Sequence, residues 1–154
     1  IEALFRDAVL TLAATHPFAR KLINSGRLSK PCDLSVSSLQ TPGDAPIRPG
    51  FSMTDAPLAG PDGPTWLTDV AQGAFTLLTA STKALPDIDG VNRIGINQSA
   101  DYPCYHSVNG HFETRYGTDK IYLLRPDGHV CAVFDTPDTD PIIAARNRAL
   151  GAIT

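Results

Sequence analysis

The segment IYLLRPDGHVCAVFD, residues 121–135, constrains the fold of this chain more than any other stretch. Its centre, Pro-Asp-Gly at 126–128, has the residue types of a type I turn followed by a bulge, and an apolar run lies on each side. The segment therefore predicts a β-hairpin with strands at 121–125 and 130–134. Because neither run alternates with polar residues, we expect both faces of the hairpin to be covered.

The elements around the hairpin indicate the fold class. Residues 75–80 and 91–96 are candidates for two earlier strands, joined by a connection with at most one helical turn. Residues 97–111 are polar and predict irregular structure. After the hairpin, Asp140 is suited to cap a helix and Pro141 to begin it. This order is typical of an α/β fold with a thioredoxin-like mixed sheet of four or five strands, flanked by helices.

The N-terminal half has a different composition. Apolar residues recur at helical spacing over residues 2–23, which predicts an N-terminal helix. Pro and Gly are then frequent among Ser, Thr and Asp, as in a loop or linker. A loop this long is unusual inside a compact domain. We therefore interpret the stretch from Lys30 to Gly63 as a strap that joins the N-terminal helix to a separate body.

Composition and charge exclude several kinds of partner. Apolar residues make up 42% of the 154 residues and charged residues 19%, which is typical of a globular protein. The net charge of −3, with no basic cluster beyond Arg20-Lys21, argues against nucleic acid and anionic membranes. No apolar run approaches the ~20 residues of a membrane span, and no signal peptide is evident, so we expect a cytoplasmic location. A start at Ile1 without Met favours a trimmed chain or a fragment of a longer one.

The cysteines argue against redox catalysis. A redox-active thioredoxin fold needs a thiolate where the first core strand ends, because a helix N-terminus lowers its pKa there. Residues 79–83 read Thr-Ala-Ser-Thr-Lys, without Cys. Cys131 falls inside a predicted strand, the usual environment of an inert buried thiol, and Cys104 lies in the irregular segment. We expect reduced thiols, no thioredoxin-type or peroxiredoxin-type activity, and no catalytic, cofactor-binding or metal-binding residue in this chain.

One cluster supports an alternative. Cys104, His106 and His111 lie within eight residues, and thiolates and imidazoles are ligands for zinc. Their spacing matches no standard zinc motif, and no fourth ligand is evident. An independent thiol- or metal-dependent enzyme that uses these three residues is the alternative function, and a stand-alone binding module is a third. Nucleotide-binding glycine motifs and a G-x-S-x-G nucleophile motif are absent.

A polar group near the end of the N-terminal helix is unusual for a plain surface helix. The simplest interpretation is a capped, solvated terminus. The other is a face that docks onto a part missing from this chain, which makes these residues candidates for an interdomain contact: His16, Arg20, Asn24, Ser25 and Arg27.

Six short motifs together carry a resemblance. THPFAR, NSGRLS, IRPG, DAPL, FTLL and LLRPDGHV occur in this order between about Thr15 and Phe134. The chain resembles the C-terminal part of FAD-dependent aromatic-ring monooxygenases of the phenol hydroxylase and hydroxyphenylpropionate hydroxylase type. Two stretches depart from the pattern. Residues 131–134 read Cys-Ala-Val-Phe where the family often has an aromatic residue or Arg, and residues 97–111 match no motif.

The resemblance implies a function for the chain as part of a larger enzyme. It implies that helical residues 1–30 end the flavin-binding and substrate part, that residues 31–65 form a Pro/Gly-rich linker strap, and that a non-catalytic thioredoxin-like domain follows at 66–154. This domain would pack against the upstream FAD-binding domain and could add a homodimer contact. The parent enzyme would use FAD, NAD(P)H and oxygen to hydroxylate an aromatic or polyketide-like substrate. Its cofactor and substrate sites would lie upstream, so the fragment alone is predicted to be inactive.

Overall fold

The computed structural model describes residues 2–19 and 32–152, which belong to two compact units. Unit 1 ends at Pro31 and unit 2 begins at Cys32. In unit 1, helix α1 (Glu2–Thr15) ends before the His16-Pro17 pair. The residue before a proline is disfavoured in helical conformation, which explains the interruption. No helix in the described ranges is long and apolar enough to cross a membrane.

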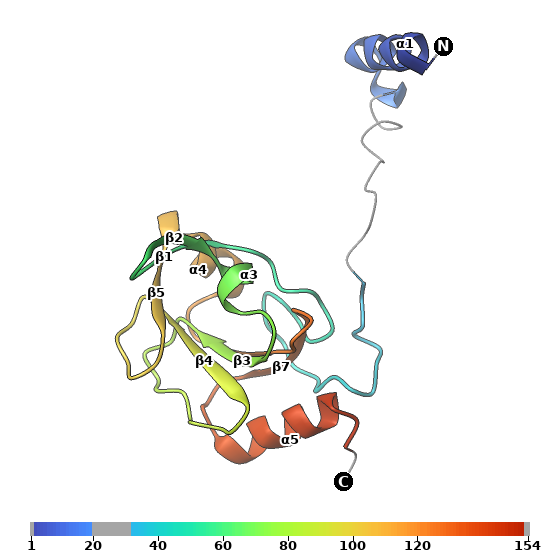
Figure 1. Ribbon diagram of the computed structural model, residues 1–154. Helices are drawn as coiled ribbons and strands as arrows, with labels where there is room; N and C mark the ends of the chain where they lie inside the picture. Colours follow the sequence, from blue (N-terminus) through green and yellow to red (C-terminus); the bar gives the residue numbers. More distant parts are fainter. Residues whose placement is uncertain (1, 20–31, 153–154) are drawn as a thin grey trace. The chain divides into compact units, whose positions relative to one another are not determined.

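Unit 2 is built on one mixed sheet of seven strands in the order β2-β1-β5-β4-β3-β6-β7 (Figure 1). The strands are β1 (Pro57–Gly60), β2 (Gly63–Trp66), β3 (Phe75–Thr79), β4 (Val91–Ile96), β5 (Cys104–Ser107), β6 (Ile121–Leu124) and β7 (Val130–Phe134). Strands β3, β4 and β5 are parallel, and the other pairs are antiparallel. This is the predicted thioredoxin-like α/β arrangement, in which a parallel pair is followed by a hairpin and a final helix.

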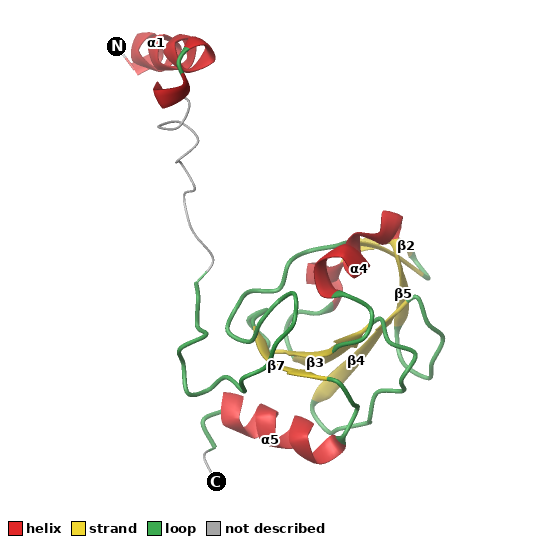
Figure 2. Ribbon diagram, turned by 180° about the vertical axis from the view of Figure 1, so that it is seen from behind, coloured by secondary structure: helices red, strands yellow, loops and turns green. Residues whose placement is uncertain are grey.

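The helices of unit 2 cover opposite faces of the sheet (Figure 2). They are α3 (Leu67–Val70), the 3₁₀ turn η1 (Val108–Gly110), α4 (His111–Tyr116) and α5 (Thr139–Ala149). One core contains Phe112 and Tyr116 of α4 with Leu78 and Leu124. The other contains Ile142 of α5 with alternate residues of the same strands. Two covered faces explain why the hairpin strands are apolar without alternation.

The predicted hairpin is confirmed as β6 and β7, which pair antiparallel with a bulge between Leu123 and Leu124. Gly128 has a φ of +79°, a backbone conformation that favours glycine. The Arg125 N–H accordingly donates to the carbonyl of His129 across the turn (2.8 Å). Turn chemistry at residues 126–128 was therefore a reliable guide to the register.

The strap differs from the expected linker. The predicted body began near residue 66, but the compact unit begins at Cys32 and includes the hairpin β1–β2. This hairpin was not predicted from the sequence, because its prolines weaken the prediction of a strand. Pro64 is tolerated because β2 is an edge strand, where a missing N–H donor faces no partner, and Pro57 is tolerated because it is the first residue of β1. The sheet consequently has more strands than the four or five expected.

Residues 32–56 form no regular strand or helix, yet they follow the outer edge of β7. The N–H groups of Thr41 and Gly50 donate to the carbonyls of Cys131 (2.9 Å) and Val130 (2.7 Å), and the Val130 N–H donates to the carbonyl of Phe51 (2.9 Å). An edge strand exposes unpaired backbone groups unless another segment covers them. The strap covers this edge.

Candidate functional site

The end of β3 is where a redox-active thioredoxin fold would place its thiol. In this chain, hydroxyl groups hydrogen-bonded to the backbone occupy that place. The Oγ1 of Thr79 donates to the Lys120 carbonyl (2.9 Å) and accepts from the N–H of Ser81 (2.9 Å). The Oγ of Ser81 accepts from the N–H of Lys83 (3.2 Å). Residues 80–90 form no helix, in contrast to the helical turn considered from the sequence. Neither a sulfur atom nor a helix N-terminus that would activate one is present at this place.

Two lysines tie the same region to the end of β7. The Lys83 Nζ donates to the carbonyl of Asp135 (2.6 Å), and the Lys120 Nζ pairs with the Asp135 carboxylate (2.6 Å). The hydrogen bond from Lys120 holds the pKa of Asp135 below its ordinary value, and the same bond raises the pKa of Lys120. Both groups are therefore charged at neutral pH, so neither is suited to accept or release a proton in a reaction there.

The three thiols occupy different environments, and all are free. Cys131 is fully buried in β7, where burial raises its pKa to about 12. Cys104 is half-buried in β5, and its Sγ donates to the carbonyl of Tyr102 (3.3 Å). Cys32 is exposed at the start of unit 2. Only a thiolate is a good nucleophile, so the Cys131 environment opposes reactivity.

The Cys104, His106 and His111 cluster is spread over two elements. Cys104 and His106 belong to β5, whereas His111 is the first residue of α4, and both imidazoles are exposed. Across residues 2–19 and 32–152, no three His, Cys, Asp or Glu side chains are grouped as a metal site would require.

A different polar network organises this part of the chain, and sequence reasoning missed it. The Oδ1 of Asn97 accepts from the N–H of Ser107 (2.9 Å), and the Nδ2 of Asn97 donates to Glu113. The Oγ of Ser107 donates to Glu113 (2.7 Å) and accepts from the N–H of Phe112 (3.1 Å). These bonds join the end of β4 to β5 and α4. Because these hydrogen bonds link residues up to 16 positions apart, no local sequence pattern predicts them.

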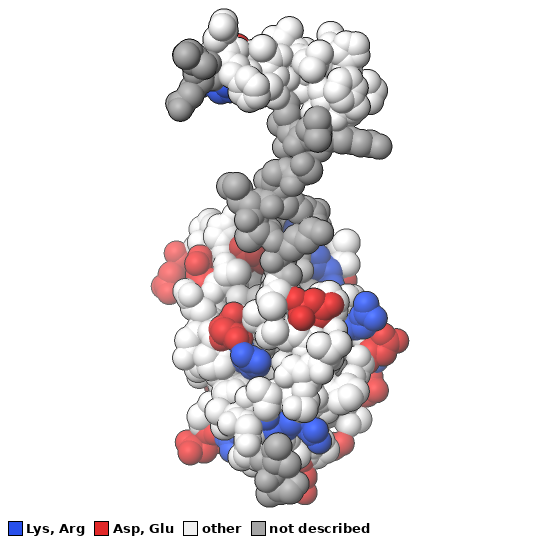
Figure 3. All heavy atoms as spheres, turned by 90° about the vertical axis from the view of Figure 1, so that its right-hand side faces the viewer, with Lys and Arg blue, Asp and Glu red and all other residues white. Residues whose placement is uncertain are grey.

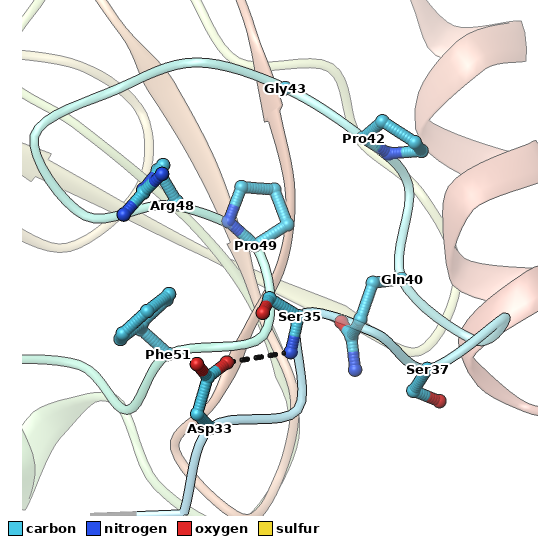
Figure 4. Close-up of a pocket in the computed structure, with 9 residues that line it drawn as sticks. All are labelled: Asp33, Ser35, Ser37, Gln40, Pro42, Gly43, Arg48, Pro49 and Phe51. Atoms are coloured by element: carbon cyan, nitrogen blue, oxygen red, sulfur yellow. Dashed lines mark hydrogen bonds between the residues drawn. The ribbon is translucent and has the colours of Figure 1, made fainter.

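The strap lines a pocket of about 300 Å³ that is open to solvent, shown in Figure 4. All nine residues that line it come from residues 33–51, and the lining combines charged, amide, hydroxyl and aromatic groups. The Arg48 guanidinium lies over the Phe51 ring, 5.5 Å from its centroid. A second pocket of about 220 Å³ lies beside the β1–β2 turn and Tyr105. Neither pocket could be recognised from the sequence.

Of the predicted interdomain residues, the structure describes only His16. It is exposed, and its ring lies 5.9 Å from that of Phe18. The other four lie outside the described residues: Arg20, Asn24, Ser25 and Arg27. On the face of unit 2 shown in Figure 3, acidic and basic side chains are interspersed.

Comparisons with known proteins identify the fold. No protein-family model matches the chain, and no curated protein matches it. Among solved structures, the flavin-dependent monooxygenase PieE, in complex with FAD and substrate, is 20% identical with a TM-score of 0.56, and the match covers 71% of this chain and 21% of that one. Aklavinone-11 hydroxylase, in a ternary complex with FAD and aklavinone, is 19% identical with a TM-score of 0.56, over 75% of this chain and 25% of that one.

A thiol peroxidase from Chromobacterium violaceum is 14% identical with a TM-score of 0.51, and the match covers 73% of this chain and 91% of that one. These identities are low, so the likenesses establish the thioredoxin-like fold and not a family. The matched region spans no more than a quarter of either monooxygenase, whereas it spans nearly the whole peroxidase.

Proposed function

We propose that this chain is the C-terminal, non-catalytic thioredoxin-like domain of an FAD-dependent aromatic hydroxylase, where it packs against the upstream FAD-binding domain. The end of β3 carries this proposal. A thioredoxin-like sheet is present, but the place of the reactive thiol is occupied by Thr79 and Ser81, whose hydroxyls bond the backbone. A body with this geometry is suited to hold other parts in place and not to exchange electrons.

The comparisons support a domain within a larger enzyme. Both monooxygenases resemble most of this chain over a small part of their own length. The peroxidase shares the fold over nearly all of its length, so the fold alone does not choose between the two kinds of protein. The missing thiol at β3 favours the monooxygenase context, as do the motifs from THPFAR to LLRPDGHV.

The exposed apolar side chains of unit 1 are consistent with a docking role. Leu4, Phe5 and Phe18 have exposed fractions of 79%, 71% and 61%. Leu4 and Phe5 lie in α1 and Phe18 follows its end, and exposed apolar residues close together in a short stretch mark contacts with another protein part. We assign this contact to the upstream flavin-binding domain of the same chain, with a second subunit as a further partner.

The parent enzyme would use FAD and NAD(P)H and would act in the cytoplasm. The residues present here do not fit a dinucleotide, because the printed sequence has no G-x-G-x-x-G segment. The cofactor sites are therefore assigned to the upstream part, and this chain contributes no step of the hydroxylation.

Purification of the native protein that contains this sequence tests the proposal. We expect a polypeptide several times heavier than 16.4 kDa that carries flavin absorbance after gel filtration. The control is the 154-residue chain produced alone, which should be colourless. Isolation of a native 16.4 kDa species without flavin would contradict the proposal.

A further inference from the structure

The strap pocket contains a buried polar side chain that the chain itself does not pair. Gln40 has an exposed fraction of 5%, and neither its Oε1 nor its Nε2 has a hydrogen-bond partner among the described residues. Figure 4 shows its amide directed into the space beside Ser35 and Ser37. A glutamine amide offers two N–H donors and a carbonyl oxygen that accepts two hydrogen bonds, so four sites for hydrogen bonds are unused.

An unpaired buried amide lowers the stability of the fold. Buried polar groups are nearly always hydrogen-bonded, because removal from water without a partner is unfavourable. The backbone N–H of Gln40 is paired with the carbonyl of Ser37 (3.2 Å), so the segment is ordered without help from the side chain. A methionine of similar length would fill this space without unpaired groups. The amide is therefore better explained by a ligand than by the fold.

The other walls of the pocket define the chemistry of that ligand. The stacked Arg48 and Phe51 side chains form a flat wall, and Pro42 and Pro49 add apolar surface. Asp33 and Arg48 place opposite charges at the pocket, and the hydrogen bonds from Ser35 keep the pKa of Asp33 below its ordinary value. A flat, uncharged group with a neighbouring N–H and C=O matches these walls. Such a group forms two hydrogen bonds with the Gln40 amide.

We propose that the strap pocket binds an extended peptide segment, and that the Gln40 amide recognises a backbone amide of this segment. The pocket lies on the surface of one irregular segment and is open to solvent. Small-molecule sites usually enclose most of their ligand, so an open groove suits an extended peptide better. Resting on the proposed function, the peptide belongs to the parent enzyme upstream of residue 1. Because both amide atoms of Gln40 are buried from solvent, binding requires a different Gln40 rotamer that turns the amide toward the open side of the pocket.

Titration of the ¹⁵N-labelled 154-residue chain with N-acetylglycylglycinamide tests this inference by NMR. The side-chain NH₂ resonances of Gln40, assigned by their loss in Gln40→Met, should shift and saturate. Gln40→Met should bind the probe at least about tenfold more weakly, a loss of ~1.4 kcal/mol. Gln98→Met is the matched control, because the Gln98 Nε2 is also buried and unpaired but does not line the pocket. It should keep the wild-type affinity.

Melting temperatures and two further binding comparisons complete the test. Gln40→Met should melt at the same temperature as the wild type or up to about 8 °C higher, because unpaired groups are removed. A lower melting temperature would show that Gln40 has a structural partner and would overturn the proposal. Equal binding by wild type and Gln40→Met would overturn it as well, as would acetamide binding as tightly as the peptide. None of these results bears on the native mass and flavin content, so the proposed function is judged separately.

Discussion

Replacing Gly50 with alanine is expected to lower the free energy of unfolding of unit 2 by about 3 kcal/mol or more. Gly50 has a φ of +95°, which is strained for any residue with a side chain. An added Cβ would also lie 2.3 Å from the backbone N and 2.4 Å from the Cα of Ser35. Backbone atoms cannot rotate away as a side-chain tip can, so the backbone segments at Ser35 and Gly50 would have to move apart.

Gly43→Ala is the matched control for the strap. Its added Cβ would find its nearest atom, the Val133 carbonyl oxygen, at 3.5 Å, which is an ordinary contact. We expect a change within about 0.5 kcal/mol for this variant. Urea denaturation followed by circular dichroism measures both variants. Equal stability of Gly50→Ala and the wild type would show that the strap is not packed as described.

Tyr116→Phe is expected to cost about 1–3 kcal/mol at pH 7. Tyr116 is fully buried, its hydroxyl donates to the Thr54 carbonyl (2.6 Å), and it accepts from the Thr54 N–H (3.0 Å). The variant keeps the ring, which stacks on Phe112 with centroids 4.5 Å apart, but it leaves both Thr54 groups without this partner. The effect therefore isolates the hydrogen bonds from the packing.

The same substitution changes the response to alkaline pH. Burial raises the pKa of Tyr116 above its ordinary value of 10.0 and raises that of Tyr122 to about 12. The unfolded tyrosines release their protons first, so this contribution is complete below pH 10 and is lost as the pH rises through the folded pKa. In Tyr116→Phe the loss above pH 10 should be smaller, because the Tyr116 contribution is removed while those of Tyr122, Cys131 and Lys120 remain.

Denaturation at several pH values between 7 and 11 checks both effects. Tyr105→Phe is the control, since Tyr105 is half-buried against the same core, and we expect a change within about 0.5 kcal/mol. An alkaline loss of equal size in Tyr116→Phe and the wild type would mean that the Tyr116 hydroxyl is not enclosed.

The sequence allowed the central part of the sheet to be predicted because local rules determine it. Turn residues at 126–128 set the hairpin, and the uninterrupted apolar runs beside the turn marked β6 and β7 as strands covered on both faces, while β3 and β4 were recognised as strand candidates. Strand β5 was missed because residues 97–111 are polar. Its backbone pairs with β4, and the side-chain bonds between Asn97, Ser107 and Glu113 that join its end to β4 and α4 are brought together only in the folded chain.

The strap shows why the candidate site was harder to predict than the fold. Its Pro and Gly content predicted a linker, but its attachment to β7 depends on the close approach at Gly50 and on backbone bonds to distant residues. Gln40 is one polar residue in a polar stretch, and its burial is a property of tertiary structure. The missing thiol at β3, in contrast, could be identified from residues 79–83 alone.

Reduction of insulin disulfides by the purified chain, with dithiothreitol as the electron source, tests the central claim most directly. With only hydroxyl groups at the end of β3, the rate should equal that of dithiothreitol alone. Cys104→Ser and Cys131→Ser should leave this background unchanged. A rate well above background that disappears in Cys104→Ser and persists in Cys131→Ser would contradict the account, because it would show that this body carries a working thiol.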